Sequence, residues 1–254
     1  MVAYSEIPLR RQITRLADKG KGALLDVIYP PRCLTCTEPT EQGANLCADC
    51  WADTTFITGA VCDICGTPLP GEADGKIKCD SCIAHRPAWD AGRAAIIYAG
   101  GGRRAVLSLK HGDRLDMARS LAEWMARSGD DLLCKADVIV PVPLHWRRLF
   151  KRKFNQSAEL AQHLSEISKT PCIPDLLVRD RFTPSQDGLT RDKRHENQQG
   201  VFSVHKRRSV PKNVLLIDDV MTTGATLSAC AETLRAAGAE RIDALVLARV
   251  ARDV

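Results

Sequence analysis

Short hydrophobic runs alternate with helical patterns over the last two thirds of the chain. The runs lie at 94–99, 136–143, 214–217 and 242–248. Each is about as long as a strand that is buried on both faces, and two prolines in the second run exclude a helix there. Residues 155–167 carry apolar positions at helical spacing behind Asn155, a suitable N-cap residue. This alternation predicts an α/β fold with a mainly parallel sheet flanked by helices.

Two further stretches show helical periodicity. The segment 107–112 is expected to lead into a helix that carries the apolar residues between Leu115 and Met125. Residues 1–30 also repeat apolar positions at helical spacing, with basic residues between them. Such a basic amphipathic helix packs either against its own domain, which is the simpler interpretation, or on a membrane surface.

Cysteines divide the chain into two chemically different parts. Eight of the eleven cysteines form four Cys-x-x-Cys pairs within one short region. Zinc takes four thiolates in a tetrahedron and each pair supplies two, so the region predicts two structural zinc sites. The ligands are Cys33, Cys36, Cys47, Cys50, Cys62, Cys65, Cys79 and Cys82. Spacing alone leaves two arrangements open, in which zinc is held by neighbouring pairs or by alternate, cross-braced pairs.

A disulfide scaffold is the alternative interpretation of these cysteines, and it needs an oxidising compartment. The N-terminal segment is basic and lacks the continuous apolar core of a secretory signal. No apolar stretch approaches the ~20 residues that a membrane span requires. We therefore expect a cytoplasmic protein with zinc-bound thiolates and no transmembrane span.

The hydrophobic run at 214–217 ends in two adjacent acids, Asp218 and Asp219. Ligands of parallel sheets bind beyond the carboxyl ends of the strands, where both carboxylates are expected. The loop at 222–226 then precedes a helix that is expected to reach about Ala237. A helix N-terminus offers unpaired N–H groups and a partial positive charge, and Gly224 lets the backbone approach a phosphate closely. The segment predicts one site for hydroxyls and a phosphate together.

This segment resembles the phosphoribosyl-pyrophosphate (PRPP) signature of type I phosphoribosyltransferases. In those enzymes the paired acids hold the ribose hydroxyls and the following loop binds the 5′-phosphate. The resemblance implies that PRPP binds Asp218, Asp219, Val220, Met221, Thr222, Thr223, Gly224, Ala225 and Thr226. It also implies Mg²⁺, which is bound through few protein ligands and the oxygens of the substrate.

Pyrophosphate release from PRPP is expected to pass through an oxocarbenium-like state, so charge on the leaving group must be neutralised. In this enzyme class a pyrophosphate loop follows a strand end. The corresponding residues here are Pro141, Val142, Pro143, Leu144 and His145. A basic patch follows directly and consists of Arg147, Arg148, Lys151, Arg152 and Lys153. The patch either contacts phosphates, of a small ligand or of a nucleic acid, or forms a solvated basic face, and the sequence favours neither.

Residues 183–197 form a long polar segment without apolar periodicity. Long loops beside a site often close over it, and arginines that face pyrophosphate give such a lid a reason to close. We therefore predict Arg191 and Arg194 as catalytic residues together with Asp218 and Asp219. An ordinary surface loop is the alternative.

The order of the motifs narrows the resemblance. The cysteine pairs are followed by Leu-Lys-His-Gly at 109–112, Pro-Val-Pro-Leu at 141–144, Phe-Asn-Gln at 154–156, Thr-x-x-Gln at 183–186, Arg-x-x-Asn at 194–197 and the PRPP signature. Over residues 24–250 this order is similar to the ComF family of bacterial competence proteins, which joins a double zinc ribbon to a phosphoribosyltransferase domain. Lys153 departs from the family pattern, which usually has glycine there. The resemblance implies a double zinc ribbon at 31–88 and a type I phosphoribosyltransferase fold at 89–254, preceded by the helical segment that periodicity predicts at 1–30.

Three functions fit this resemblance, because a fold does not determine an activity. The first is a phosphoribosyltransferase that transfers the phosphoribosyl group from PRPP and releases pyrophosphate. The second is a non-catalytic PRPP sensor that binds single-stranded DNA. The third is an adaptor whose ribbons dock on a DNA-uptake helicase or a recombination loader. All three imply a role in competence, in the uptake or use of imported DNA. Few aromatic residues lie in the ribbon region, which argues against a base-stacking platform.

Overall fold

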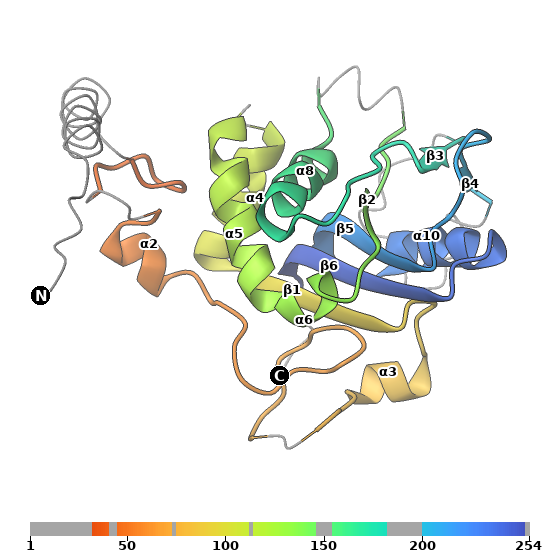
Figure 1. Cartoon of the computed structure of the whole chain (residues 1–254). Helices are drawn as coiled ribbons and strands as arrows, with labels where there is room; N and C mark the ends of the chain where they lie inside the picture. The colour runs from red at the N-terminus through yellow and green to blue at the C-terminus, as the bar shows by residue number, and fades with distance from the viewer. Residues whose placement is uncertain are drawn as a thin grey trace, which may run out of the picture. The chain divides into compact units, whose positions relative to one another are not determined.

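The computed structural model describes residues 32–40, 45–72, 75–111, 114–145, 154–181 and 200–251, except the side chain of His111. The chain divides into two compact units, residues 1–52 and residues 53–254 (Figure 1). Each unit is treated by itself below. The helix predicted at 1–30 lies outside the described residues, as do the basic patch and the whole polar segment at 183–197.

A four-stranded sheet forms the centre of the second unit, in the order β1-β6-β5-β2. Its strands are β1 (Ala91–Ile97), β2 (Val138–Pro141), β5 (Asn213–Met221) and β6 (Arg241–Arg249). All three pairings are parallel, which confirms the predicted sheet. β5 is longer than the hydrophobic run at 214–217, because its last residues still pair with β6.

Helices pack on both faces of this sheet. The helical segments of the unit are α3 (Asp80–Ala84), α4 (Gly100–His111), η1 (Leu115–Met117), α5 (Ala118–Ser128), α6 (Asp130–Leu133), α8 (Gln156–Ser168) and α10 (Ala225–Ala236). Helix α5 packs against α8 and against the sheet. Val214 and Leu216 of β5 point to a core shared with α10, so Leu215 and Ile217 point to the other face.

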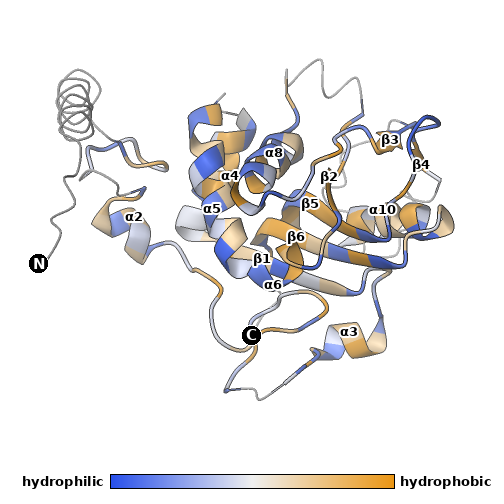
Figure 2. Ribbon diagram, viewed as in Figure 1, coloured by the Kyte–Doolittle hydropathy of each residue, from blue (hydrophilic) through white to orange (hydrophobic). Residues whose placement is uncertain are grey.

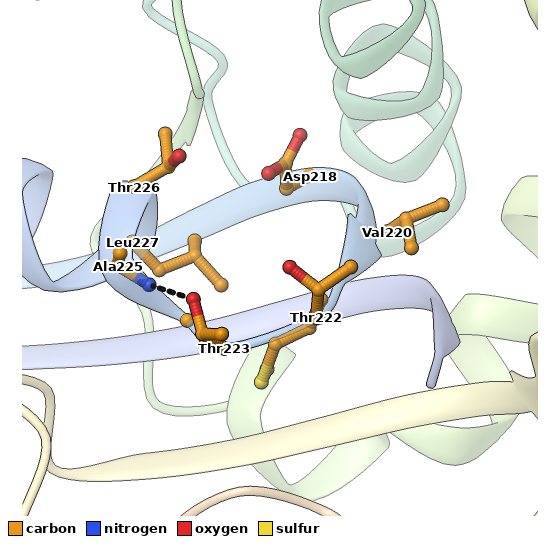
Figure 3. A pocket seen from close by; sticks show the side chains of 9 residues that line it. Asp218, Val220, Thr222, Thr223, Ala225, Thr226 and Leu227 are labelled. Carbon is orange, nitrogen blue, oxygen red and sulfur yellow. Dashed lines mark hydrogen bonds between the residues drawn. The ribbon is translucent and has the colours of Figure 1, made fainter. Parts of the chain in front are cut away.

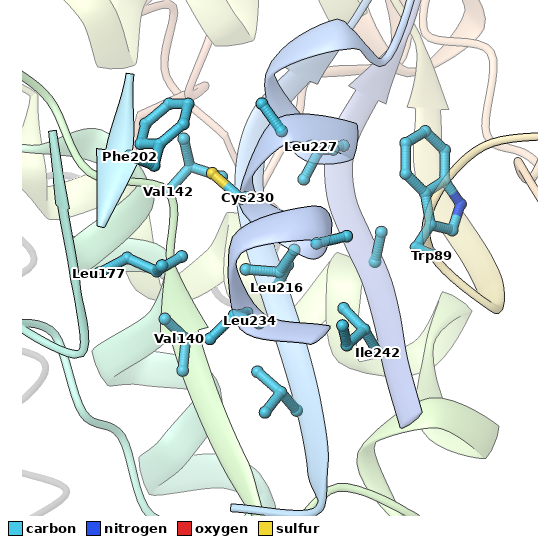
Figure 4. Close-up of a cluster of buried hydrophobic side chains, with 14 of the residues drawn as sticks. Trp89, Val140, Val142, Leu177, Phe202, Leu216, Leu227, Cys230, Leu234 and Ile242 are labelled. Atoms are coloured by element: carbon cyan, nitrogen blue, oxygen red, sulfur yellow. The ribbon is translucent and has the colours of Figure 1, made fainter. Parts of the chain in front are cut away.

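The core on the α10 face contains side chains from every strand of the sheet (Figure 4). Leu227, Cys230 and Leu234 of α10 are buried there, and so is Trp89, which precedes β1. The antiparallel pair β3 (Leu177–Arg179) and β4 (Phe202–Val204), which the sequence patterns did not predict, also packs on this face. The hydropathy colouring in Figure 2 shows β5 and β6 as largely apolar.

The start of helix α4 differs from the prediction. The segment 107–112 was expected to lead into a helix, but residues 107–111 are themselves the last part of α4. The helix begins at Gly100, within a run of three glycines that propensity alone disfavours. Tertiary packing outweighs that cost, since Ala105, Val106 and Leu109 are fully buried. None of the helices in the described ranges is long and apolar enough to cross a membrane.

The two cysteine clusters share one local plan. In each, an antiparallel bridge encloses the first Cys-x-x-Cys pair: Arg32 pairs with Pro39 in the first unit, and Val61 with Pro68 in the second. A short helix then carries the last cysteine, α2 (Ala48–Ala52) in the first and α3 in the second. We call the described residues 32–52 the first ribbon and 61–84 the second ribbon.

Candidate functional site

The predicted acids lie at the carboxyl end of β5, where the chain turns into α10. Asp218 lines a pocket together with Val220, Met221, Thr222, Thr223, Gly224, Ala225, Thr226 and Leu227 (Figure 3). The structure thus places one predicted acid and the whole predicted loop around one cavity. Parallel strands end on the same edge of a sheet, which is why this pocket opens there.

The two acids have different surroundings, because neighbouring residues in a strand point to opposite faces. Asp218 accepts hydrogen bonds from Oγ of Ser157 and from the backbone N–H of Asp219, both at 2.9 Å. The carboxylate of Asp219 is largely buried and lies 3.1 Å from Nζ of Lys110. Burial, together with the negative charge of Asp219, raises the pKa of Asp218 to about 7.

Two helices bring polar partners to the acids. Asn155 is the N-cap of α8, as predicted, and its Oδ1 accepts from the backbone N–H of Ser157 at 3.1 Å. This cap positions the first turn of α8, from which Ser157 reaches Asp218. Lys110 belongs to the last turn of α4. Lys110 and Ser157 were not predicted as site residues, although Lys110 belongs to the Leu-Lys-His-Gly motif, which was the available signal.

The loop between β5 and α10 has the form that a phosphate site requires. Gly224 is the N-cap of α10 and has a φ of 80°, a left-handed conformation that favours glycine. Oγ1 of Thr223 accepts from the N–H of Ala225 at 3.4 Å (Figure 3). The first turn of a helix has further N–H groups without intrahelical partners, and its dipole favours an anion.

The predicted pyrophosphate loop leaves the sheet beside the acid pair. Pro141 of β2 pairs with Ile217, the residue before Asp218. The next residue, Val142, donates its N–H to the Ile217 carbonyl at 2.9 Å, and its own carbonyl accepts from Nδ2 of Asn155 at 3.1 Å. His145 is buried. This segment therefore adjoins the site but does not line the pocket at Asp218.

Both cysteine clusters have the geometry of zinc sites. In each, the four Sγ atoms lie within 4.8 Å of one another, and Cys36–Cys47 and Cys65–Cys79 are 3.6 Å apart. A tetrahedral zinc with bonds of about 2.3 Å places its sulfurs about 3.8 Å apart, whereas a disulfide measures about 2.05 Å. The clusters therefore fit structural zinc, and none of the eleven cysteines, all of which lie in the described ranges, forms a disulfide.

The structure also decides the pairing that spacing left open. Cys33, Cys36, Cys47 and Cys50 form one cluster, and Cys62, Cys65, Cys79 and Cys82 form the other. Neighbouring pairs thus share a site, and the cross-braced arrangement is excluded.

Similarity to curated proteins covers nearly the whole chain. The competence protein F of Haemophilus influenzae is 30% identical over 228 residues, which make up 86% of this chain and 96% of that protein. This chain belongs to the ComF family. The DNA utilization protein YhgH of Escherichia coli K12 is 29% identical over 87% of this chain and 97% of its own length. Competence protein ComFC of Bacillus subtilis is 26% identical over 80% of this chain and 82% of its own.

Two family models match separate parts of this ComF protein. A double zinc ribbon domain matches residues 24–83, and a phosphoribosyl transferase domain matches residues 157–253. With the parallel sheet and the two cysteine clusters, they establish the predicted fold class, a type I phosphoribosyltransferase fold preceded by a double zinc ribbon. The first match ends at the second ribbon, which nevertheless belongs to the same compact unit as the sheet.

Solved structures resemble this ComF protein only weakly. The PRPP amidotransferase from B. subtilis, solved with ADP and GMP, aligns with a TM-score of 0.38 and 20% identity over 55% of this chain and 30% of that one. A hypoxanthine phosphoribosyl transferase from Trypanosoma cruzi gives 0.35 and 19% over 53% of this chain and 66% of that one. These TM-scores and identities are too low to add to what the family models show.

Several predicted residues lie outside the described part of the chain. These are Arg147, Arg148, Lys151, Arg152 and Lys153 of the basic patch, and the predicted catalytic residues Arg191 and Arg194. Their roles stay predictions. The predicted domain limits at 31 and 89 also stay predictions, because a division by compactness falls at a different place, between residues 52 and 53.

Proposed function

We propose that this ComF protein binds PRPP at the carboxyl end of β5. One observation carries the proposal: Asp218 and the loop that ends in the N-terminus of α10 line the same pocket. A carboxylate suits ribose hydroxyls, and a glycine-capped helix N-terminus suits a phosphate. PRPP carries both groups on one sugar. The phosphoribosyl transferase model that matches residues 157–253 supports the same ligand.

The roles of the acids follow from their surroundings. Asp218 faces the pocket and accepts from the ribose hydroxyls, while Ser157 holds its carboxylate in place. Asp219 is paired with Lys110 and does not line the pocket, so its proposed contact with the ribose hydroxyls rests on the resemblance to the PRPP signature. Carboxylate oxygens are ligands that Mg²⁺ prefers, so the donor set at Asp218 fits the ion. When bound, Mg²⁺ neutralises charge that develops on the pyrophosphate oxygens.

If the site is active, the reaction is transfer of the phosphoribosyl group from PRPP to an acceptor nucleophile. The bond between the anomeric carbon and the pyrophosphate oxygen breaks, and a bond from that carbon to the acceptor forms. Arg191 and Arg194 are proposed to stabilise the departing pyrophosphate together with the segment 141–145, which adjoins the acids.

The test is PRPP binding measured by titration calorimetry with Mg²⁺. We expect the double variant Asp218→Asn and Asp219→Asn to weaken PRPP binding at least 100-fold. The matched control is Asp130→Asn with Asp131→Asn, another adjacent acid pair, which lies at the start of α6. This control should bind PRPP within about threefold of the native chain. Equal affinity in the native chain and the Asp218/Asp219 variant would contradict the proposal.

Pyrophosphate release separates a transferase from a sensor. Native chain is incubated with PRPP and Mg²⁺, with and without a small-molecule cell extract. Release that requires the extract and is lost in the Asp218/Asp219 variant identifies a transferase and provides an assay for the acceptor. Tight binding without release identifies a PRPP sensor.

We further propose a role in the uptake or use of DNA, which the names of the relatives support. Single-stranded DNA is the proposed partner of the basic patch at 147–153. Its binding should weaken steeply with salt and when the five basic residues are neutralised, because counterion release drives it. Salt-insensitive binding would exclude this mode and would favour the ribbons as a docking module for a helicase or recombination loader.

A further inference from the structure

The second ribbon is joined to the sheet by contacts from its first Cys-x-x-Cys turn, residues 62–65. The carbonyl of Asp63 accepts from the N–H of Gly92 at 3.0 Å, and its carboxylate lies 3.1 Å from Nη2 of Arg93. Gly66 follows the turn, and a Cβ there would lie 3.0 Å from the backbone of Arg93 and Ala94. The turn and strand β1 therefore lie in direct backbone contact.

Trp89 extends this contact to the candidate phosphate loop. Its side chain is 2% exposed, and its Nε1 donates to the carbonyl of Ile64 at 2.5 Å, within the same cysteine turn. The opposite edge of the ring meets Gly224, where an added Cβ would lie 2.5 Å from Cη2. Figure 4 shows the ring beside α10 and β6. The side chain of Trp89 thus contacts both the cysteine turn at 62–65 and Gly224, the N-cap of α10.

Arg249 provides a second connection, independent of Trp89. Its Nη1 donates to the carbonyl of Cys65 at 2.8 Å and lies 2.8 Å from Sδ of Met221. Met221 is the last residue of β5, and Arg249 is its partner in the register of β6. A small pocket is lined both by the ribbon, through Cys65, Ser81 and Cys82, and by the loop, through Thr222 and Thr223. The ribbon and the start of the loop are therefore neighbours at this pocket.

We propose that the second zinc ribbon is a positioning element of the phosphate loop, and that Trp89 is the positioning residue through which it acts. Zinc bound by the second cluster fixes the turn at 62–65, including the carbonyls of Ile64 and Cys65. Trp89 and Arg249 donate to these carbonyls. The far edge of the Trp89 ring contacts Gly224, and the same Nη1 of Arg249 that donates to Cys65 also contacts Sδ of Met221. A loop held in its binding conformation pays less ordering entropy when the ligand arrives, so the fixed turn strengthens PRPP binding. The inference rests on the proposed binding of PRPP at this loop.

The first measurement is the PRPP affinity of Trp89→Phe. Phenylalanine keeps an aromatic ring but cannot donate to Ile64, and its shorter ring leaves Gly224 without its neighbour. We expect the Kd for PRPP to rise about tenfold. Trp124→Phe is the matched control, since Trp124, on α5, is also buried but packs against Phe56. It should leave the Kd within twofold. Arg249→Met tests the second connection and should raise the Kd severalfold.

The second measurement uses the reciprocity of linked binding, which a merely structural role of Trp89 would not produce. If zinc strengthens PRPP binding, PRPP must raise the zinc affinity of the second cluster by the same factor. The chain with Cys33→Ser and Cys36→Ser retains only that cluster, and its zinc affinity is measured by equilibrium competition with a chelator. Saturating PRPP should raise it about tenfold, and adding Trp89→Phe together with Arg249→Met should abolish the increase.

The outcomes separate this inference from the proposed function. The positioning role alone would be overturned by two results together. The native chain, Trp89→Phe and Arg249→Met would bind PRPP equally well, and PRPP would not alter the zinc affinity. Absence of PRPP binding by the native, zinc-loaded chain would overturn the proposed function and, with it, this inference. Zinc content and circular dichroism of each variant establish that it is folded.

Discussion

The two zinc ribbons share a local plan but differ in what surrounds them. Thr37 follows the second cysteine of the first ribbon and has a φ of 65°, and Gly66 holds the same position in the second ribbon with a φ of 67°. A β-branched residue is strained in that conformation, yet the first ribbon tolerates one. In the second ribbon strand β1 lies so close that a Cβ would meet its backbone at 3.0 Å.

The two ribbons also belong to different compact units. The first ribbon belongs to the compact unit of residues 1–52. The second shares a unit with the sheet, and its cysteine turn contacts the residues that hold the candidate site. The sequence does not distinguish the two clusters, since both have four cysteines at similar spacing. Its tertiary contacts make the second ribbon an extension of the α/β domain.

Removing one zinc site at a time is expected to give the largest difference in stability between variants of the two ribbons. Cys62→Ser with Cys65→Ser should lower the Tm of the main unfolding transition by about 10 °C or more, because zinc binding and the contacts of the second ribbon are lost together. Cys33→Ser with Cys36→Ser should leave that transition within about 2 °C. Differential scanning calorimetry checks both variants. Equal shifts would remove the distinction between the ribbons.

Gly224→Ala should have the next largest effect. The new Cβ lies 2.5 Å from the ring of Trp89, and the residue keeps a φ of 80°, so clash and backbone strain add up. We expect a loss of about 3 kcal/mol in the free energy of unfolding and at least tenfold weaker PRPP binding. Gly59→Ala is the control, because Gly59 has a φ of 76° but open space around it. That variant measures the strain alone and should retain PRPP affinity.

Thr37 and Gly66 hold the same position in the two ribbons, and replacing each by the other residue type tests the comparison directly. Gly66→Thr should destabilise the second unit by about 2 kcal/mol, because β1 cannot move away without breaking its pairing with β6. Thr37→Gly relieves a positive φ and should be neutral or slightly stabilising for the first unit. Chemical denaturation followed by circular dichroism measures both. A Gly66→Thr variant as stable as the native chain would show that the second ribbon is only loosely attached.

The smallest expected effect is a pH dependence that belongs to the second unit. The pKa of Asp218 is raised from 3.8 to about 7 on folding, so the folded chain binds this proton more tightly than the unfolded chain. Stability from this group is therefore lost as pH rises through that range, by about 1 kcal/mol between pH 6 and 7. Asp218→Asn should remove this loss. Parallel stability profiles of the native chain and the variant would contradict the raised pKa.

Much of this architecture could be predicted from the sequence, because its signals are local. Four hydrophobic runs mark the four strands of the parallel sheet, and Asn155 caps α8 as expected. The acid pair and the loop after it fall at one strand end because they are adjacent in the chain. The eight zinc ligands follow from four Cys-x-x-Cys pairs. In each case the spacing of a few residues contains the information.

Contacts between distant residues were decided by the tertiary structure alone. Lys110 and Ser157 reach the acids because α4 packs against β1 and β6 and α8 packs against β5, and no local pattern encodes these contacts. The pairing of the cysteines depends on how two short turns fold back, which spacing left open. The connection from the second ribbon through Trp89 to Gly224 joins residues that are far apart in the chain. Sequence determines which elements form and which side chains they carry, whereas packing against a shared core determines which of those side chains meet.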